Sequence, residues 1–247
     1  MKISICIPMY NELGKVTDTA VLLTSELEAF CENSGDTYEI IFSDDGSTDG
    51  CANAVPTSED LSLTHGSIIT VRREQNRGKG AAVREAVLIS KGNVVMYTDC
   101  DLAYGTAVIP EAFEAMKTET TDMMAGSRAI HPNGYGEYTA LRRIASKVYI
   151  KLISAITGLK FTDSQCGFKL FRGDFARRVF AECETDGWAF DLELFLLAKR
   201  DGAEVREFPV AIVKHDDSHV NVIKDSVKML REVFRIKKRV KSSAKRK

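Results

Sequence analysis

The sequence predicts an α/β protein with a mostly parallel central sheet flanked by helices. Three observations predict it: apolar runs of strand length alternate with helical patterns, the runs are apolar on both faces, and polar loops containing glycine follow them. The chain has 247 residues, 44% of them hydrophobic, which suits one large domain with a small appendage. This composition excludes disordered and fibrous proteins.

The expected strands are five runs rich in β-branched or apolar residues, at 3–8, 38–43, 67–71, 93–98 and 122–127. A first helix is expected where Val16, Ala20, Leu23 and Leu27 share one helical face, and a second at 81–90. In such sheets ligands bind beyond the carboxyl ends of the strands, so the residues that follow each strand are the candidates for a site.

The cysteine spacing and the hydropathy of the sequence indicate the cellular compartment. The six cysteines show no CxxC spacing, which is typical of reduced thiols in a cytosolic protein. The apolar run at the N-terminus is about five residues, too short for an export signal. No run of about 18 apolar residues is present, so no membrane-spanning segment is expected.

Acids, amides and glycines stand at the expected strand ends. The fourth strand ends in Asp99-Cys100-Asp101, and two carboxylates one residue apart favour a divalent cation, Mg²⁺ or Mn²⁺. The cation would remove their repulsion and supply positive charge to a phosphate ligand, which indicates a nucleoside diphosphate. The alternative is a solvated turn that contains two acids.

The second and third strand ends leave similar choices open. Asp44 directly follows its strand and could accept a hydrogen bond from a nucleobase N–H or a ribose hydroxyl, whereas residues 47–49 suit a helix cap. Gly78-Lys79-Gly80 matches neither common phosphate-loop spacing. The loop either places Lys79 near a ligand or is an ordinary glycine-rich turn.

Taken in order, MYNE, DDGSTDG, NRGKGAA and DCD resemble the nucleotide-diphospho-sugar domain of the family 2 glycosyltransferases, which has the GT-A fold. Residues 126–128, 163–171 (DSQCGFKLF) and 188–193 (WAFDLE) resemble acceptor-side motifs of the branch that makes polyprenyl-phosphate sugars. Within that branch they look closest to the dolichyl-phosphate beta-glucosyltransferases. The resemblance covers about 3–213, so a GT-A domain is expected at 1–218 and an amphipathic basic tail at 219–247.

The resemblance implies roles for the donor side. The base and ribose would be held by Pro8, Tyr10, Glu12 and Asp44. Lys79 would join the donor site, and Asp99 and Asp101 would engage the metal and the diphosphate. Relatives often carry glutamine where this chain has Ala103, so the metal would have one protein ligand fewer.

The resemblance also implies an acceptor side. The acceptor phosphate would be received by Arg128, by Arg142 or Arg143, and by Lys169 as a third candidate. Asp191 would position groups in the site, or act as a general base if the acceptor were a hydroxyl. A helix cap or a buried ion pair is the structural alternative for Asp191. The residues expected to carry the chemistry are therefore Asp101, Arg128 and Asp191.

The reaction that follows is a single in-line displacement at the anomeric carbon, with inversion, by a metal-dependent hexosyltransferase. The expected donor is UDP-glucose and the expected acceptor a polyprenyl or dolichyl phosphate. Two alternatives stay open. One is a glycosyltransferase of the same fold that acts on a hydroxyl, and the other is an inactive nucleotide-binding protein that organises membrane partners.

The C-terminal segment differs in charge from the rest. Eleven of the 34 Lys and Arg residues but two of the 35 acids lie at 224–247, which leaves 23 bases and 33 acids before it. An apolar helical stripe is expected at Ile223, Val227, Leu230 and Phe234. This helix either lies in a membrane interface, peripherally on the cytoplasmic face and beside a membrane-protein partner, or packs on the protein body. Nucleic-acid binding is not expected, because no aromatic residues follow in the basic run.

Overall fold

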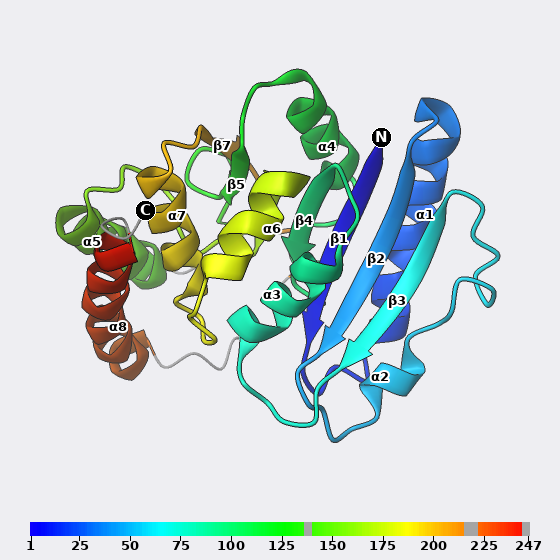
Figure 1. The fold of residues 1–247 in the computed structure, drawn as a ribbon, viewed down its shortest axis with the longest axis horizontal. Helices are drawn as coiled ribbons and strands as arrows, with labels where there is room; N and C mark the ends of the chain where they lie inside the picture. The colour runs from blue at the N-terminus through cyan, green and yellow to red at the C-terminus, as the bar shows by residue number, and fades with distance from the viewer. Residues whose placement is uncertain (136–139, 215–221, 244–247) are drawn as a thin grey trace.

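The computed structural model describes residues 1–135, 140–214 and 222–243, without the side chains of 140–147, 149 and 222–231 (Figure 1). The sheet runs in the order β3-β2-β1-β4-β6-β5-β7. Its strands are β1 (Lys2–Met9), β2 (Thr37–Asp44), β3 (Gly66–Arg72), β4 (Val94–Thr98), β5 (Met123–Ser127), β6 (Phe168–Arg172) and β7 (Val205–Pro209). The helices are α1 (Val16–Ser34), α2 (Cys51–Ala54), α3 (Lys79–Ile89), α4 (Val108–Thr118), α5 (Ala140–Thr157), α6 (Gly173–Glu182), α7 (Phe190–Arg200) and α8 (Val222–Ser243).

The sheet is parallel except at β6. β1 pairs in parallel with β2 and β4, β2 with β3, and β5 with β7, whereas β6 runs antiparallel between β4 and β5. The five predicted strands are confirmed to within one residue at each end, and the two predicted helices are also present. The carboxyl ends of β1, β2 and β4 therefore meet at one edge, as the sequence indicates.

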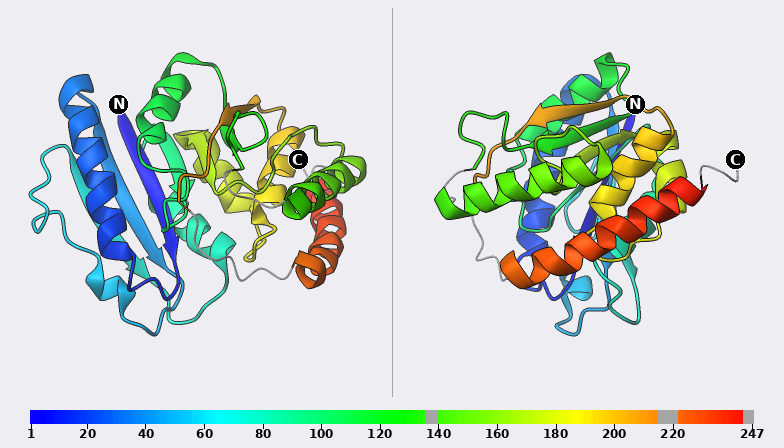
Figure 2. Two further views of the ribbon diagram at one scale, coloured as in Figure 1. Left: turned by 180° about the vertical axis from the view of Figure 1, so that it is seen from behind. Right: turned by 90° about the vertical axis from the view of Figure 1, so that its left-hand side faces the viewer.

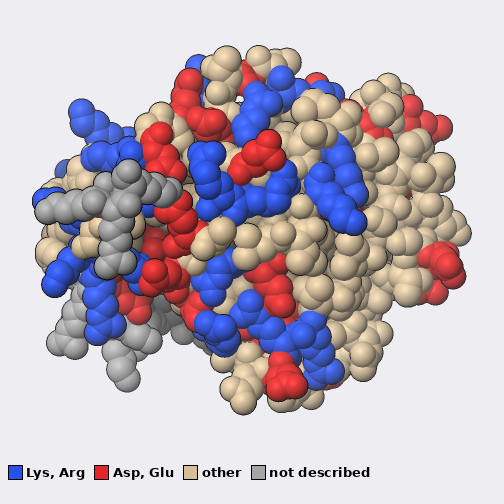
Figure 3. Space-filling view, viewed as in Figure 1, with Lys and Arg blue, Asp and Glu red and all other residues tan. Residues whose placement is uncertain are grey.

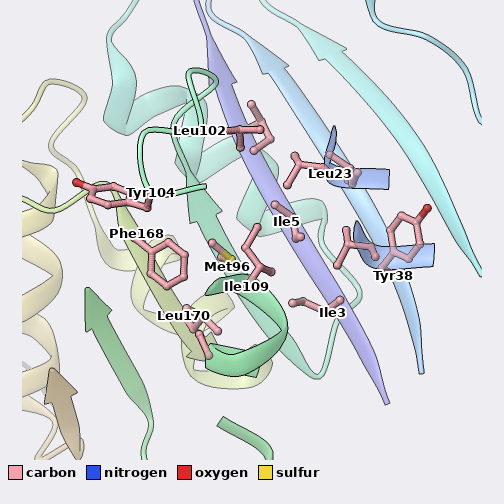
Figure 4. Close-up of a cluster of buried hydrophobic side chains, with 14 of the residues drawn as sticks. Ile3, Ile5, Leu23, Tyr38, Met96, Leu102, Tyr104, Ile109, Phe168 and Leu170 are labelled. Carbon is pink, nitrogen blue, oxygen red and sulfur yellow. The ribbon is translucent and has the colours of Figure 1, made fainter. Parts of the chain in front are cut away.

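Two hydrophobic layers hold the helices on the sheet (Figure 2). On one face α1 and α4 cover β1, and the predicted apolar face of α1 is fully or almost fully buried there. Figure 4 shows part of this layer, with Ile5, Met96 and Phe168 side by side and the hydroxyl of Tyr104 directed away from the aliphatic groups. On the other face α3, α6 and α7 cover the sheet around Tyr97. Such burial is the main favourable term in folding.

The second half of α8 packs on the protein body. Val233, Ile236 and Val240 are buried in the same layer as α7, while Phe234 is 60% exposed. Figure 2 shows α8 beside α5 and α7 at the end of the molecule. Phe234 therefore does not belong to the packed face, and the side chains of the other predicted stripe residues lie outside the described part. In the described ranges no helix is long and apolar enough to cross a membrane.

Candidate active site

Asp44 is the last residue of β2, and only one of its two carboxylate oxygens accepts a hydrogen bond from the described residues. Its side chain is fully buried, and Oδ1 accepts a hydrogen bond from the backbone N–H of Ser47 at 2.9 Å. Arg72 Nε lies 3.3 Å from Oδ2, but among the described residues no group makes a hydrogen bond to that oxygen. A buried carboxylate oxygen without such a partner is costly unless a ligand supplies the donor. Asp44 thus has the chemistry to accept from a nucleobase N–H.

The neighbouring polar residues build the loops rather than face a ligand. Asp45 accepts hydrogen bonds from the backbone N–H groups of Arg77, at 3.1 Å, and Gly78, at 2.6 Å. Asn11 donates its N–H to Ser47 Oγ at 2.9 Å. These contacts tie the loop after β3 and the loop after β1 to the end of β2. Neither Asp45 nor Asn11 was predicted to build a loop, although the doubled aspartate at 44–45 is a signal for a second role at that strand end.

The remaining predicted donor residues lie at the end of β1. Pro8 is half-buried, and Tyr10 is 47% exposed. Glu12 makes an ion pair with Lys15 at 3.1 Å. Met9 is in register with Asp44, so the loop that carries Tyr10 and Glu12 begins directly beside that carboxylate.

Asp99 and Asp101 follow β4 at the same edge. Asp99 is an ion-pair partner of Lys79, and its side chain is 36% exposed. Asp101 Oδ1 accepts the N–H of Ala103 at 3.0 Å, and its side chain lines a pocket of about 240 Å³ together with the start of α1. Within the described ranges no group of three His, Cys, Asp or Glu side chains is arranged around a metal position. Two carboxylates nevertheless fit Mg²⁺ or Mn²⁺ chemistry, because substrate phosphates and water commonly supply the remaining ligands.

Lys79 sits at the start of α3 among carboxylates. Burial lowers the pKa of its ammonium, but Asp99, Asp191 and Asp101 outweigh that effect and the pKa is raised. Lys79 therefore stays charged at neutral pH. Its Nζ also lies 5.0 Å from the ring centre of Trp188, a cation–π distance.

The glycines around Lys79 are explained by packing. A Cβ on Gly78 would lie 2.6 Å from the carbonyl oxygen of Asp186, and one on Gly80 would lie 2.5 Å from that of Thr185. Gly78 also has φ +115°, which side chains rarely adopt. The loop is thus shaped to receive the 183–189 segment, while Lys79 turns toward Asp99.

Arg128 directly follows β5 and makes a two-point ion pair with Asp163. Its Nε and Nη2 donate to the two carboxylate oxygens of Asp163 at 2.6 and 3.0 Å, and Asp163 is buried. Burial lowers the pKa of the guanidinium, but the hydrogen bonds and charge of Asp163 outweigh burial and raise it. Arg142 and Arg143 lie on α5, and their side chains are outside the described part of the structure.

Lys169, a predicted ligand of the acceptor phosphate, is instead fully buried in β6. Its Nζ donates to the carbonyl oxygen of Cys166 at 2.6 Å and to Asp191 Oδ1 at 2.8 Å. The hydroxyl of Tyr97 donates to the same oxygen of Asp191. Lys169 therefore supports Asp191. A buried ion pair was one of the alternatives predicted for Asp191, and the structure contains that pair.

The 183–189 segment, which joins α6 to α7, forms the far wall of the site. Asp186 makes ion pairs with Arg77 at 2.7 Å and Arg84 at 2.5 Å. Burial alone would raise the pKa of the Asp186 carboxyl. The hydrogen bonds and charges of Arg84 and Arg77 outweigh burial, so the pKa is lowered. The segment presents Trp188, which is 64% exposed, beside Lys79. The pairing of Asp186 with Arg84 has no local sequence signal, because the two residues are 102 positions apart.

The fold is of the GT-A type. The structure superposes on glucosyl-3-phosphoglycerate synthase from Mycobacterium tuberculosis, crystallised with Mn²⁺, UDP and glucosyl-3-phosphoglycerate, with a TM-score of 0.64 and 16% identity over 95% of this chain and 78% of that one. It superposes on mannosyl-3-phosphoglycerate synthase from Rubrobacter xylanophilus with a TM-score of 0.63 and 15% identity, over 99% and 75% of the two chains. At these identities the likeness establishes the fold alone.

The chain belongs to glycosyl transferase family 2, whose family model matches residues 4–180. It is 29% identical to a dolichyl-phosphate beta-glucosyltransferase of Saccharomyces cerevisiae, over 95% of this chain and 74% of the relative. It is 31% identical to the Dictyostelium discoideum protein of the same name, over 95% and 73%. It is also 27% identical to glycosyltransferase AglD of Haloferax volcanii, over 95% of this chain but 37% of that protein.

Proposed function

We propose that this protein transfers glucose from UDP-glucose to a polyprenyl phosphate such as dolichyl phosphate, with inversion at the anomeric carbon. The names of the two relatives at 29% and 31% identity support this donor sugar and this acceptor. The bound UDP and Mn²⁺ of a structural neighbour support a uridine nucleotide and a divalent cation.

One geometric observation carries the proposal. Asp44 ends β2 and Asp99 follows β4, and a single strand, β1, lies between them. Neighbouring strands are about 4.8 Å apart, so the two acids are separated by about 10 Å along the edge. That distance suits a nucleoside diphosphate whose base meets Asp44 and whose phosphates meet Asp99. Oδ2 of Asp44, which accepts no hydrogen bond from the described residues, supplies the acceptor for a base N–H.

The chain's own residues account for the charges of the reaction. A divalent cation, Mg²⁺ or Mn²⁺, held by Asp99 and Asp101 would stabilise the leaving diphosphate. Lys79, already beside Asp99, is placed to add positive charge there. Arg128 would meet the acceptor phosphate in competition with Asp163, which orients the guanidinium.

The state of Asp191 favours a phosphate acceptor over a hydroxyl. A phosphate is already an anion at neutral pH and needs no base, whereas a hydroxyl acceptor does. Oδ1 of Asp191 already accepts hydrogen bonds from Nζ of Lys169 and from the hydroxyl of Tyr97, so this oxygen is engaged within the protein. We therefore expect Asp191→Asn to slow turnover with lipid phosphate without abolishing it. Complete loss in a single-turnover assay would favour the hydroxyl-acceptor alternative.

The test is release of nucleoside diphosphate from a panel of UDP- and GDP-sugars, with and without a short polyprenyl phosphate. We expect release from UDP-glucose that needs both the lipid phosphate and a divalent cation, and that Asp101→Ala removes. Asp174→Asn is the matched control, because that carboxylate is fully exposed. Donor binding that the lipid phosphate leaves unchanged would contradict the acceptor, and release from a GDP-sugar would contradict the donor.

We also propose that the protein associates peripherally with the cytoplasmic face of a membrane, where such a lipid would be found. Exposed apolar side chains on α5 and α8 support this, namely Val148, Leu152 and Phe234. The exposed Lys238 lies near Phe234 on α8 and would favour anionic lipid. Flotation with vesicles that contain anionic lipid should be weakened by Phe234→Ser and unchanged by Val21→Ser, a change at an exposed position on α1. Equal flotation of both variants would contradict it.

A further inference from the structure

A buried carboxylate on α7 holds the segment that leads into the site. Glu193 is 1% exposed, and its Oε2 accepts hydrogen bonds from the backbone N–H groups of Thr185, at 2.8 Å, and Glu184, at 3.2 Å. Burial raises the pKa of Glu193, but the hydrogen bonds from Arg239 and Thr185 outweigh burial and the pKa is lowered. Glu193 therefore stays ionised and fixes the first residues of the 183–189 segment.

The cation that balances Glu193 comes from the C-terminal helix. Arg239 of α8 donates from Nε to Glu193 Oε1 at 3.0 Å, and its Nη2 lies 2.6 Å from Oε2. The same Nη2 donates to Thr185 Oγ1 at 2.8 Å. Figure 3 shows acidic side chains next to the basic ones at this end of the molecule. Arg239 thus binds both the carboxylate and the segment that the carboxylate holds.

The opposite side of the segment touches the donor edge. The carbonyl oxygen of Asp186 accepts the N–H of Ala81 in the first turn of α3, at 3.1 Å. Two residues later the ring of Trp188 lies under the ammonium of Lys79, which is paired with Asp99. The 183–189 segment therefore joins Arg239, on one side, to Lys79 and Asp99 on the other.

We propose that Arg239 is a positioning residue for the donor site: through Glu193 and Thr185 it fixes the segment that holds Trp188 against Lys79. The C-terminal helix thereby sets the affinity for the diphosphate of the donor, a role that rests on the proposed function. Packing of α8 does not need this residue, because Val233, Ile236 and Val240 supply the buried face. The polar contacts of Arg239 are instead directed at the segment and the carboxylate that holds it.

The experiment compares Arg239→Met with Lys241→Met, which removes an exposed cation two residues further along α8. Trp188 is the sole tryptophan of the chain, so its emission and its quenching by acrylamide report on the segment without any ligand. We expect Arg239→Met to increase quenching and to speed hydrogen exchange at Thr185 and Ala81. The KM for the nucleotide sugar should rise on the order of three- to tenfold while the KM for lipid phosphate stays unchanged. Lys241→Met should match the parent protein in all of these.

Two further variants separate positioning from simple support. Arg239→Lys keeps the charge but not the two-point geometry, and should restore only part of the donor KM. If Arg239 acts through Glu193, the effects of Arg239→Met and Glu193→Gln on that KM should not add. Unchanged quenching and exchange in Arg239→Met, or a parallel rise of both KM values with a lower unfolding temperature, would overturn the proposal. A parent protein that binds no nucleoside diphosphate contradicts the proposed function alone, because emission and exchange need no ligand.

Discussion

Adjacent aspartates at the end of β2 do different work. The carboxylate of Asp45 accepts hydrogen bonds from the backbone N–H groups of Arg77 and Gly78, and so stabilises the loop that leads to α3. Asp44 satisfies only Oδ1 within the described part of the protein, at the N–H of Ser47. Asp45 therefore stabilises the fold, whereas Asp44 keeps one carboxylate oxygen available to accept a hydrogen bond from a ligand. The hydrogen-bond donors that surround each aspartate therefore decide its role, although the two side chains are chemically identical.

This difference predicts the effect of Asp44→Asn. The amide keeps one acceptor oxygen for Ser47 but can present an N–H₂ group where a base N–H would arrive, so donor binding should weaken. A hydrogen bond to a charged group is worth about 1.5–3 kcal/mol, which corresponds to roughly a 10- to 100-fold rise in the KM for UDP-glucose. Steady-state kinetics and titration with UDP measure it. An unchanged Kd for UDP would show that Asp44 does not contact the base.

The sequence predicts which residues lie at the ends of the strands, but not which distant side chains pair with one another. It places Asp44, Asp99 and Arg128 at the edge because each directly follows an apolar run, and the structure has all three at strand ends. It could not predict that Lys169 is buried beside Asp191 or that Arg239 reaches Glu193. Those pairs are 22 and 46 residues apart, and their partners are decided by tertiary packing, which leaves no local pattern.

At the scale of elements, the start of α3 and the 183–189 segment depend on each other. Gly80 lies so close to the segment that an added Cβ would meet Thr185 O at 2.5 Å and Phe190 Cβ at 2.7 Å. Arg84 and Asp186 add an ion pair across the same contact. The donor edge is therefore made by two elements far apart in the sequence, and the first turn of α3 can hold Lys79 in place only while both are docked.

The contact predicts opposite results for two glycine substitutions. Gly80→Ala should destabilise the protein by about 1–3 kcal/mol, because the methyl group meets backbone and ring carbons that cannot easily move. Gly187→Ala lies in the same contact region but has open space around the added Cβ, so it should change stability by less than about 0.5 kcal/mol. Urea unfolding of the two variants compares them directly. Equal stability would mean that the segment moves aside at little cost.

The elements that the sequence did not predict have a common reason. Of the five strands predicted from apolar runs, β1, β2, β4 and β5 are mostly buried, which gives a continuous signal, and β3 is a partly exposed edge strand rich in β-branched residues. β6 is short, runs antiparallel and carries the buried cation Lys169 in its second position, so its apolar pattern is broken. β7 is an edge strand with alternating exposure, and its five residues include Arg206 and Glu207. Short or polar strands are recognised only once their neighbours are known.

Over the whole molecule, the acidic body and the basic C-terminal helix are joined by specific ion pairs. Arg239 of α8 lies 2.6 Å from Glu193 and 3.5 Å from Glu184. Glu193 belongs to a set of carboxylates whose pKa values are lowered in the folded protein by hydrogen bonds and cations that outweigh burial, the others at comparable sites being Glu28, Asp36, Glu39 and Asp186. Such groups favour the folded state only while they are ionised, so the molecule should lose stability in acid.

Asp36 gives the sharpest test of this acid dependence. It is buried at the start of β2, and Lys117 at the end of α4 donates to it at 2.8 Å. Burial raises its pKa, but hydrogen bonds from Lys117 and from the N-terminal ammonium of Met1, at 2.5 Å, outweigh burial and lower the pKa from 3.8 to about 2. Because the folded pKa lies below the unfolded one, the contribution is full above pH 5 and disappears as the pH falls toward 2. It amounts to about 1–2 kcal/mol, roughly half of which should be lost by pH 3.

The measurement is urea unfolding of the parent protein and of Asp36→Asn between pH 7 and pH 3. The asparagine cannot titrate, so the variant should be less stable by about 1–2 kcal/mol at pH 7, and the two curves should approach each other as the pH falls through 4. Asp174→Asn, at a fully exposed carboxylate, should stay parallel to the parent protein throughout. A constant difference between the parent and Asp36→Asn down to pH 3 would mean that the charge of Asp36, paired with Lys117 and with the N-terminal ammonium of Met1, does not stabilise the folded state.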